Sequence, residues 1–432
     1  MESCTTVNAD QDTIDRIRYA QVVEDGCANN AVQVSSERAE AARGYCLGLG
    51  ALPGELLGPA SDRVVDVLIA ATRRKLAESG SEAAGQDAEL RRNAVEGLGN
   101  VCTALHAVGA LQPGQMERAF AAVMTAFGDY AMDNRGDVGS WVREAAMAVG
   151  ASMLRLQVVE TSAQGGELIA DMCQRMFPAL VKQAVEKIDR LRGVAGTTLQ
   201  GLLHNDPPLA EWIPDAEAIL AAVPSDAKIN WQSSKDSFPP LVGLLQTDTY
   251  HYPVLSGLVV SVGGLTESLL KHGRDELLTQ LEEAEDPEEL VKRVAGSLLR
   301  LLREADHETR VVIPTLKTIE FLLESMVGLE ELQPPEHPFS TDLVQVRRTF
   351  GSATHLLIQL RKSSCPQLIR AEIRAAPKDI HLVLATCNTL SAVLLFEEPT
   401  RSDAFSSMLM LLCHRYPKVR RAFPFTHFLI LN

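Results

Sequence analysis

The segment Tyr130–Val149, YAMDNRGDVGSWVREAAMAV, combines a polar turn with the start of a helix. Within the turn, Gly136 can adopt the positive φ that a tight corner often needs. Asp137 follows it, at a position where a carboxylate can accept a backbone N–H from the first turn of a helix. Apolar residues then recur at helical spacing, which predicts one continuous apolar stripe. The residues of this stripe are Trp141, Val142, Ala145, Ala146 and Val149. The segment therefore predicts the end of one helix, a corner and the beginning of the next helix.

Arg143 lies one turn inside the predicted second helix. Its planar guanidinium donates several hydrogen bonds and can reach a capping carboxylate of a neighbouring helix pair. We expect a buried Arg143 that pairs with Asp137 or Asp133. Because Asp137 and Arg143 are six positions apart, they do not share a helix face, so the partner has to come from a turn or from an adjacent repeat. The alternative is an exposed Arg143 with little energetic weight.

Four segments that begin with an arginine can be aligned with one another. They are RGYCLGLG from Arg43, RNAVEGLG from Arg92, REAAMAVG from Arg143 and RGVAGTTL from Arg192. The steps between these arginines are 49, 51 and 49 residues, and self-similarity at such a step indicates stacked supersecondary units. A capping aspartate followed by Val-Arg and a face of small residues, as at Asp137, Val142 and Arg143, is typical of the second helix of a HEAT or armadillo pair. The predicted fold is therefore all-α, an α-solenoid of HEAT/armadillo-like helical repeats with Pro-rich inter-repeat loops.

Composition divides the chain into five parts. Residues 1–12 are polar and expected to be disordered, and residues 204–240 hold six prolines that interrupt the repeats. We expect the latter to be an inter-repeat loop that Trp212 and Trp231 pin to the repeats. The five parts are the disordered N-terminus 1–12, helical repeats at 13–203, the Pro/Trp-rich loop 204–240, helical repeats at 241–422 and a truncated or atypical tail at 423–432. Smaller expected features are a helix at Ile14–Val23, a loop at 78–88, a second Pro-rich loop at 326–341 and Val-Arg pairs at 346–347 and 419–420.

The net charge, the apolar runs and the cysteine spacing of the chain argue against several classes of protein. The 432 residues carry a net charge of −15 with no basic domain, which disfavours nucleic-acid binding. The longest apolar run, Val254–Leu265, is too short to span a bilayer, and the polar N-terminus is not a signal peptide. The eight cysteines form no CxxC or Cys/His cluster, so neither a metal knuckle nor a disulfide framework is expected. Most of these thiols lie in apolar helical sequence, which fits a reducing compartment.

Motif-like sequences with possible chemistry have simpler explanations. Cys46 stands in a G-x-C-x-G pattern, but its helical flanks predict a buried helical cysteine rather than a nucleophile elbow. Residues 133–144 have carboxylates at positions 1, 5 and 12 of a calcium loop, but position 6 is Val138, where the loop needs glycine. The tripeptide Arg-Gly-Asp at 135–137 has the sequence of an adhesion motif, and we interpret it as a coincidence. We interpret the acidic run 275–289 as a solvated helix face. With no P-loop and no HExxH motif, we assign no catalytic, cofactor-binding or metal-binding residue and expect no enzyme.

The segment NRGDVGSWVREAAM, residues 134–147, resembles the signature segment of the tubulin-folding cofactor D family, also called tubulin-specific chaperone D. Further runs that support the resemblance are EKIDRLR at 186–192, LLH at 202–204, YPVLSGLVVSVGGLTESL at 252–269 and YPKVR at 416–420. The resemblance extends from about residue 90 to about residue 420 and concerns only the C-terminal part of those longer proteins. The chain is therefore expected to be a fragment, an incomplete gene product or a split form, and its last ten residues depart from the family pattern. The signature residues are Asp133, Asn134, Arg135, Gly136, Asp137, Trp141 and Arg143.

This resemblance implies a cytoplasmic chaperone scaffold, with some members associated with the cytoskeleton at centrosomes. Family members capture β-tubulin and work with tubulin cofactors E and C and an Arf-like small GTPase. Together they assemble and take apart the αβ-tubulin dimer and stimulate GTP hydrolysis by tubulin, with the catalytic residues supplied elsewhere. The helical array alone also allows a second reading, a HEAT-repeat adaptor for other protein cargo. Neither reading identifies the residues that contact tubulin.

Overall fold

The computed structural model describes residues 39–73, 87–159, 166–264, 266–305, 308–325 and 380–394, together with 401–402, 405, 408–409 and 416–421. Several expected features lie outside these residues. They are the N-terminus 1–12, the helix at Ile14–Val23, nearly all of the loop 78–88, the second Pro-rich loop 326–341, the Val-Arg pair at 346–347 and the tail 423–432.

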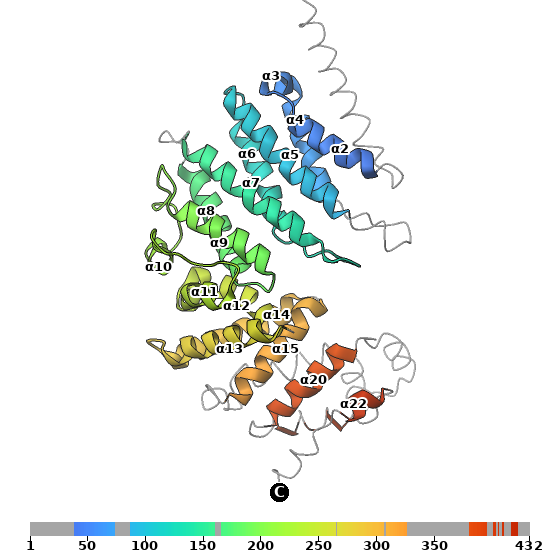
Figure 1. Cartoon of the computed structure of the whole chain (residues 1–432), viewed down its shortest axis with the longest axis vertical. Helices are drawn as coiled ribbons and strands as arrows, with labels where there is room; N and C mark the ends of the chain where they lie inside the picture. Colours follow the sequence, from blue (N-terminus) through green and yellow to red (C-terminus); the bar gives the residue numbers. More distant parts are fainter. Residues whose placement is uncertain are drawn as a thin grey trace, which may run out of the picture. The chain divides into compact units, whose positions relative to one another are not determined.

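The chain divides into two compact units. Unit 1 comprises Met1–Leu180 and Val194–Ala216, and unit 2 comprises Val181–Gly193 and Glu217–Asn432. Helices make up almost all of the regular structure among the described residues, where a single pair of two-residue strands is the exception (Figure 1). The predicted all-α fold of stacked helical repeats is confirmed.

Unit 1 is built from two rows of helices. The helices α2, α5 and α7 pack in sequence in the first row, and α4 and α6 pack against them in the second (Figure 1). The elements of this part are α2 (Ala39–Gly50), α3 (Gly54–Leu57), η2 (Gly58–Ala60), α4 (Ser61–Thr72), α5 (Ala88–Ala107), α6 (Pro113–Ala126), β1 (Met132–Asp133), β2 (Gly136–Asp137) and α7 (Gly139–Val159). Two further helices, α8 (Gly166–Ala184) and α9 (Asp189–Leu203), are divided between the units.

Small residues let the helices of the first row approach one another closely. A Cβ added to Gly50 of α2 would lie 2.8 Å from the Cα of Gly97 in α5. A Cβ added to Gly99 on α5 would lie 2.8 Å from a methyl group of Val149 in α7. Real Cβ atoms do not approach other atoms so closely, so the small residues of the Arg-led segments form the packing faces between successive helices.

Unit 2 is organised around α12, whose residues are buried on nearly every side. Its Ser261 hydroxyl donates to the backbone carbonyl of Val185 at 3.0 Å, which ties the helix to the segment after α8. The helices α13, α14 and α15 pack against α12, and α20 packs against α15. The elements are α10 (Ala216–Ala222), α11 (Ser234–Val242), η3 (Gly243–Gln246), α12 (Asp248–Val262), α13 (Glu267–Glu282), α14 (Pro287–Glu304), α15 (Thr309–Glu324), α20 (Ile380–Val393) and α22 (Pro417–Arg421).

The Pro/Trp-rich stretch 204–240 contains more regular structure than its prolines suggest. It includes α10 and most of α11, which are short helices of 7 and 9 residues. Proline removes backbone donors and interrupts long helices, but short helical turns still fit between and around these residues. Trp231 is buried in unit 2, as expected of an anchoring residue, whereas Trp212 in unit 1 is only half-buried.

His251 of α12 is buried, and both of its ring nitrogens lie near polar groups of unit 2. Its Nδ1 lies 2.7 Å from the carbonyl of Leu245 and its Nε2 lies 3.1 Å from the hydroxyl of Ser297. Burial lowers the pKa of the imidazole and outweighs the raising effect of the hydrogen bond to Leu245. As the pH falls below 6.5, His251 becomes protonated in the unfolded chain but stays neutral in the folded state. The free energy of unfolding therefore decreases, until the pH reaches the lowered pKa of the folded state.

We therefore expect that the wild-type chain loses more unfolding free energy between pH 7 and pH 5.5 than the variant His251→Gln. The difference in slope is at most about 1.4 kcal/mol per pH unit, because one proton is involved. Urea denaturation at both pH values measures the two losses. Equal losses in the two proteins would show that His251 does not carry this dependence.

Candidate functional site

A short β-hairpin, formed by β1 and β2, connects α6 to α7 (Figure 1). Asn134 and Arg135 form its tip, and the following residue, Gly136, has a φ of +107°. Residues with a side chain rarely adopt this conformation, so glycine is the residue that fits. Asp133 closes the tip, because its Oδ1 accepts the backbone N–H of Arg135 at 2.7 Å. The predicted corner is present, as a hairpin rather than a simple turn.

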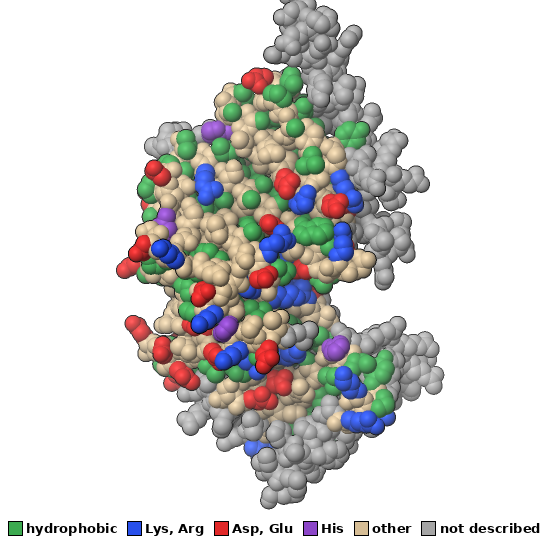
Figure 2. Space-filling model, viewed as in Figure 1, with side chains coloured by type: hydrophobic (Ala, Val, Ile, Leu, Met, Phe, Trp, Pro, Cys, Tyr) green, Lys and Arg blue, Asp and Glu red, His purple; other side chains and the backbone are tan. Residues whose placement is uncertain are grey.

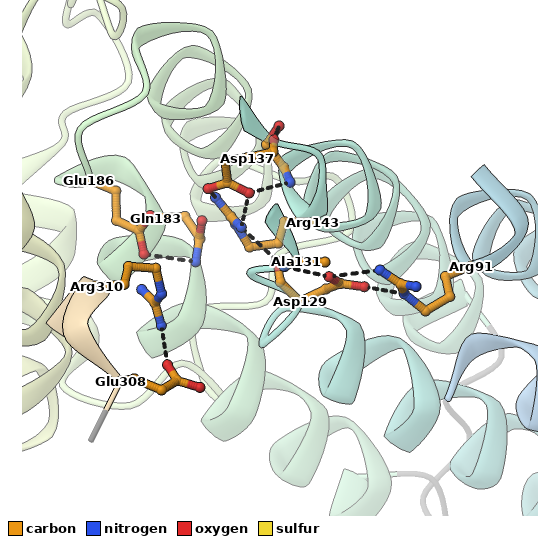
Figure 3. Close-up of polar contacts among 10 residues, drawn as sticks. Arg91, Asp129, Ala131, Asp137, Arg143, Gln183, Glu186, Glu308 and Arg310 are labelled. Carbon is orange, nitrogen blue, oxygen red and sulfur yellow. Dashed lines mark hydrogen bonds and ion pairs between the residues drawn. The ribbon is translucent and has the colours of Figure 1, made fainter. Parts of the chain in front are cut away.

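Arg143 is fully buried where the hairpin joins α7 (Figure 3). Its Nη2 donates to Oδ2 of Asp137 at 3.0 Å and its Nη1 donates to Oδ1 at 3.2 Å. Nη1 also donates to the backbone carbonyl of Asp129 at 2.6 Å. The guanidinium carbon lies 4.0 Å from the centre of the Tyr130 ring, within the range of a cation–π contact. The expected ion pair with Asp137 is confirmed, and the alternative of an exposed Arg143 is excluded.

Asp137 also holds the beginning of α7. Its Oδ1 accepts the backbone N–H of Ser140 at 3.0 Å, and the Ser140 hydroxyl donates to the backbone carbonyl of Asp137 at 2.6 Å. The carboxylate therefore satisfies an N–H that the helix cannot pair internally, as the sequence predicts. One buried carboxylate thus orients the helix and neutralises the arginine that the helix carries.

Asp129 links α5, the preceding helix of the first row, to Arg143 of α7. Its Oδ1 accepts Nη2 of Arg91, a residue of α5, at 3.1 Å, and it accepts the backbone N–H of Ala131 at the same distance (Figure 3). Both partners of this ion pair are largely buried, with side chains 7% and 11% exposed. Since the backbone carbonyl of Asp129 accepts from Arg143, a single residue connects α5 to α7. Sequence reasoning assigned no role to Asp129 or Arg91.

The same kind of contact joins α2 to α5. Asp87 caps α5 by accepting the backbone N–H of Leu90 at 2.9 Å, and it also pairs with Nε of Arg43 at 2.7 Å. In both steps, an arginine of one helix reaches an aspartate in the connection that leads to the next helix of the row. We call these two contacts, Arg43–Asp87 and Arg91–Asp129, the arginine–aspartate rungs. An aspartate shortly before each predicted helix is the sequence signal that could have revealed them.

The alignment of the Arg-led segments placed Arg92 in this series, and the structure places Arg91 there instead. Arg92 is half-exposed and pairs with Glu96 on its own helix. Adjacent positions on a helix differ in direction by about 100°, so only one of two neighbouring arginines can point toward α7. The choice depends on how α5 is rotated in the stack.

The fourth aligned residue, Arg192, lies in unit 2 and has different partners. Its Nη1 donates to the backbone carbonyl of Glu186 at 2.9 Å, and its Nη2 donates to the backbone carbonyl of Gln232. Its Nε has no acceptor among the described residues. Burial lowers the pKa of this guanidinium, and the charge of Asp189 offsets only part of that effect. Arg192 holds the end of the Pro/Trp-rich stretch but is not a rung of the unit 1 series.

The tip of the hairpin is the exposed part of the site. Arg135 pairs with Asp133 at 2.7 Å and lies over the Trp141 ring at 4.8 Å from its centre. Asp133 is therefore not available to Arg143, and the side-chain hydrogen bond from Arg135 lowers the pKa of the Asp133 carboxyl. Met132 on β1 is 48% exposed. The tip presents a paired cation and carboxylate beside one exposed apolar side chain.

The buried groups of this site hold the hairpin and the neighbouring helices in place. Arg143 and Asp137 are buried and occupied with each other, so the Arg-Gly-Asp tripeptide does not present its aspartate. No group of three His, Cys, Asp or Glu residues within the described residues is placed to hold a metal ion. Figure 2 shows Lys/Arg and Asp/Glu side chains interspersed on the viewed face, without the continuous basic band that phosphate binding needs.

Cys46 is a buried helical residue, as the sequence predicts. Burial raises the pKa of its thiol to about 11 and those of Cys102 and Cys173 to about 12. At pH 8 the native Cys46 thiol is ionised about 100-fold less than a thiol of pKa 9.0, and the thiolate is the reactive form.

We expect iodoacetamide to leave these three cysteines unmodified in the native protein and to modify them after unfolding in urea. Peptide mass mapping identifies the modified cysteines. Rapid modification of Cys46 in the native protein would instead favour the interpretation of Cys46 as a nucleophile.

The structure offers no helix, within the described part of the chain, that is long and apolar enough to cross a membrane.

Comparison with known proteins gives a consistent family relationship. Residues 174–354 match the model of the family described as "Tubulin folding cofactor D C terminal". The chain is 23% identical over 317 residues to "Tubulin-specific chaperone D" of Dictyostelium discoideum, an alignment that covers 68% of this chain and 20% of that protein. It is 39% identical over 72 residues to "Tubulin-folding cofactor D" of Schizosaccharomyces pombe, covering 17% of this chain and 6% of that protein.

These matches bear on the two units differently. The matched family domain lies mostly in unit 2, and the arginine–aspartate rungs and the hairpin precede it in the chain. The alignment to the Dictyostelium protein spans about a fifth of that protein's length. The resemblance noted from the sequence is confirmed for the C-terminal part of the family.

Proposed function

Since residues 174–354 of this chain match the model of the tubulin folding cofactor D C-terminal family, we propose that the chain is a non-catalytic scaffold in tubulin folding. It binds β-tubulin and works with tubulin cofactors E and C and an Arf-like small GTPase. In this role it takes part in assembling and disassembling the αβ-tubulin dimer in the cytoplasm and at the cytoskeleton, including centrosomes. The family match is the observation that carries the proposal.

The fold supports a scaffold because stacked helix pairs create extended surfaces that can hold a folded partner. The buried polar groups of unit 1 are used to fix one helix against the next, which favours a rigid support over a reactive site. In the proposed role, Asp137 and Arg143 are positioning residues that set the direction of the hairpin. The tip residues Asp133, Asn134 and Arg135, with Trp141 beneath them, are presented by that support.

The proposed contribution to GTP hydrolysis is indirect. The chain holds tubulin and the other cofactors together, and tubulin and the partner proteins supply the catalytic groups. We expect phosphate release from tubulin-bound GTP to rise when this chain, cofactor E and cofactor C are combined. Omitting this chain is expected to remove the increase, and the chain alone is expected to release no phosphate.

Retention of β-tubulin by the purified chain tests the proposal directly. The tagged chain is immobilised, incubated with αβ-tubulin or with β-tubulin released from chaperonin, washed and analysed for bound protein. Retention of β-tubulin, but not of an unrelated acidic protein of similar size, is the expected result. If β-tubulin passes through while another protein cargo is retained, the chain is a HEAT-repeat adaptor and the tubulin proposal is wrong.

A further inference from the structure

Helix α22 in unit 2 presents a group of cations to solvent. Its five residues are PKVRR, and Val419 at the centre is buried, with 1% of its surface exposed. Lys418, Arg420 and Arg421 are all exposed. We call these three residues the basic cluster of α22.

Carboxylates are missing from the immediate surroundings of the basic cluster. Helix α22 contains no Asp or Glu, and neither does α20, against which it packs. In the sequence, the whole stretch 404–432 lacks Asp and Glu, although 56 of the 432 residues of the chain are acidic. Where Figure 1 places α22, the coloured residues on the viewed face of Figure 2 include Lys/Arg side chains and no Asp/Glu side chain. The cluster is therefore a local excess of positive charge in a chain with a net charge of −15.

Other exposed cations of unit 2 are neutralised within their own helix. On α14, Arg300 pairs with Glu304 at 2.7 Å, and Lys292 pairs with Glu288. Both pairs join residues four positions apart, which are neighbours on a helix surface. Because α22 has no carboxylate, its cations cannot be neutralised in this way. A partner that brings carboxylates to α22 gains attraction without having to break an ion pair within the helix.

We infer that the basic cluster of α22 binds an acidic segment of a partner protein. The planar guanidinium groups of Arg420 and Arg421 match the geometry of carboxylates, and Lys418 adds a third positive charge. From Lys418 to Arg421 the helix rises about 4.5 Å, and side chains on one face of an extended peptide repeat about every 6.6 Å. Long cationic side chains bridge this difference, so a run of Asp or Glu residues fits the cluster. This inference goes beyond the tubulin proposal and does not depend on it.

The size of the basic cluster favours a protein segment over a nucleic acid. A nucleic acid carries charge along its whole length and would continue past the cluster over the surface of an acidic chain, which repels it. An acidic segment of a few residues can place its charges on the cluster alone. The attraction is between exposed groups, so the binding is expected to be sensitive to salt.

Fluorescence anisotropy of a fluorescein-labelled peptide of ten glutamates, titrated with the full chain, tests the inference. The wild-type chain is expected to bind this peptide but not a labelled Gly-Ser peptide of the same length. Exposed ion pairs each contribute a small factor, so reversing all three charges, with Lys418→Glu, Arg420→Glu and Arg421→Glu, is expected to weaken binding about 10-fold or more. Binding is also expected to weaken from about 0.1 M to about 1 M salt, because the Debye length falls from about 10 Å to about 3 Å.

A matched control reverses one lysine and two arginines elsewhere in unit 2, with Lys235→Glu, Arg300→Glu and Arg303→Glu. All three residues are exposed, and the variant has the same net charge as the cluster variant. It is expected to bind the glutamate peptide within about 3-fold of the wild type, since salt screens charges that are more than a Debye length away. Glutamine at the three cluster positions removes the attraction without adding repulsion, and it is expected to weaken binding by a smaller factor in the same direction.

Three results overturn the inference. The first is no binding of the glutamate peptide by the wild-type chain, and the second is an equal loss of binding in the cluster and control variants. The third is tighter binding of a labelled ten-nucleotide single-stranded DNA that the cluster variant loses, which assigns the cluster to nucleic acid. Retention of β-tubulin is a separate measurement, so the failure of one proposal does not imply failure of the other.

Discussion

The variant Arg143→Ala is expected to lose about 3–5 kcal/mol of unfolding free energy, because it removes one partner of a buried ion pair. The change leaves the carboxylate of Asp137, 8% exposed, without its cation. It also leaves the backbone carbonyl of Asp129 without its donor and removes the contact over the Tyr130 ring. Urea denaturation followed by circular dichroism measures the loss.

Two controls separate the buried ion pair from arginine content in general. Arg135→Ala removes an exposed arginine from the same hairpin, and we expect no measurable change because water already solvates that pair. The double variant Arg143→Met with Asp137→Asn removes both buried charges and keeps a side-chain oxygen for the Ser140 N–H, so it is expected to recover much of the stability lost in Arg143→Ala. An Arg143→Ala midpoint equal to that of the wild type would mean that the ion pair contributes nothing to folding.

The variant Gly257→Ala is expected to destabilise unit 2 by about 3 kcal/mol, at the upper end of the usual cost of overpacking. A Cβ at Gly257 would collide with the backbone carbonyl of Lys182 and would lie 2.7 Å from a methyl group of Val185. A backbone carbonyl cannot move aside as a flexible side chain can, so α12 has to shift away from the last turn of α8, which contains Lys182. That shift also lengthens the hydrogen bond from Ser261 to Val185. The change in the urea midpoint measures the effect, followed by Trp231 fluorescence in a background in which Trp141 and Trp212 of unit 1 are replaced by Phe.

Gly296→Ala provides a control of opposite sign in the same unit. Gly296 lies inside α14, and within the described residues no atom approaches its Cβ position to within 4 Å. With space available, alanine is expected to stabilise the helix by about 0.5–1 kcal/mol through its higher helix propensity. If both glycine variants shift the midpoint in the same direction, close packing at Gly257 is not the cause.

The local features of the site could be predicted from the sequence. Gly136 marks the corner, Asp137 caps the helix that follows, and Arg143 is too distant along that helix to share a face with Asp137. These features depend on residues that are a few positions apart, so local geometry restricts the possible contacts. The expected Arg143–Asp137 pair is present because the turn brings the carboxylate of Asp137 back over the first turn of α7.

Contacts between distant segments could not be predicted in the same way. Arg91 and Arg92 are adjacent in the sequence, and the rotation of α5 in the stack decides that Arg91 reaches Asp129. Asp129 carries two separate contacts, one through its carboxylate and one through its backbone carbonyl, and no sequence pattern specifies a backbone acceptor. Arg192 aligns with Arg143, but its guanidinium donates to two backbone carbonyls, because its surroundings in unit 2 are different.

The sequence by itself determined the all-α class, the repeat step near 50 residues, the corner at Gly136 and the helix cap at Asp137. Each of these follows from periodicity or from interactions over a few residues, where the covalent chain limits the conformations. Only the tertiary structure decided which arginine of α5 is buried and which aspartate joins α5 to α7. Those outcomes depend on how each helix is rotated against its neighbours, and that rotation is set by side chains packed together from the whole stack.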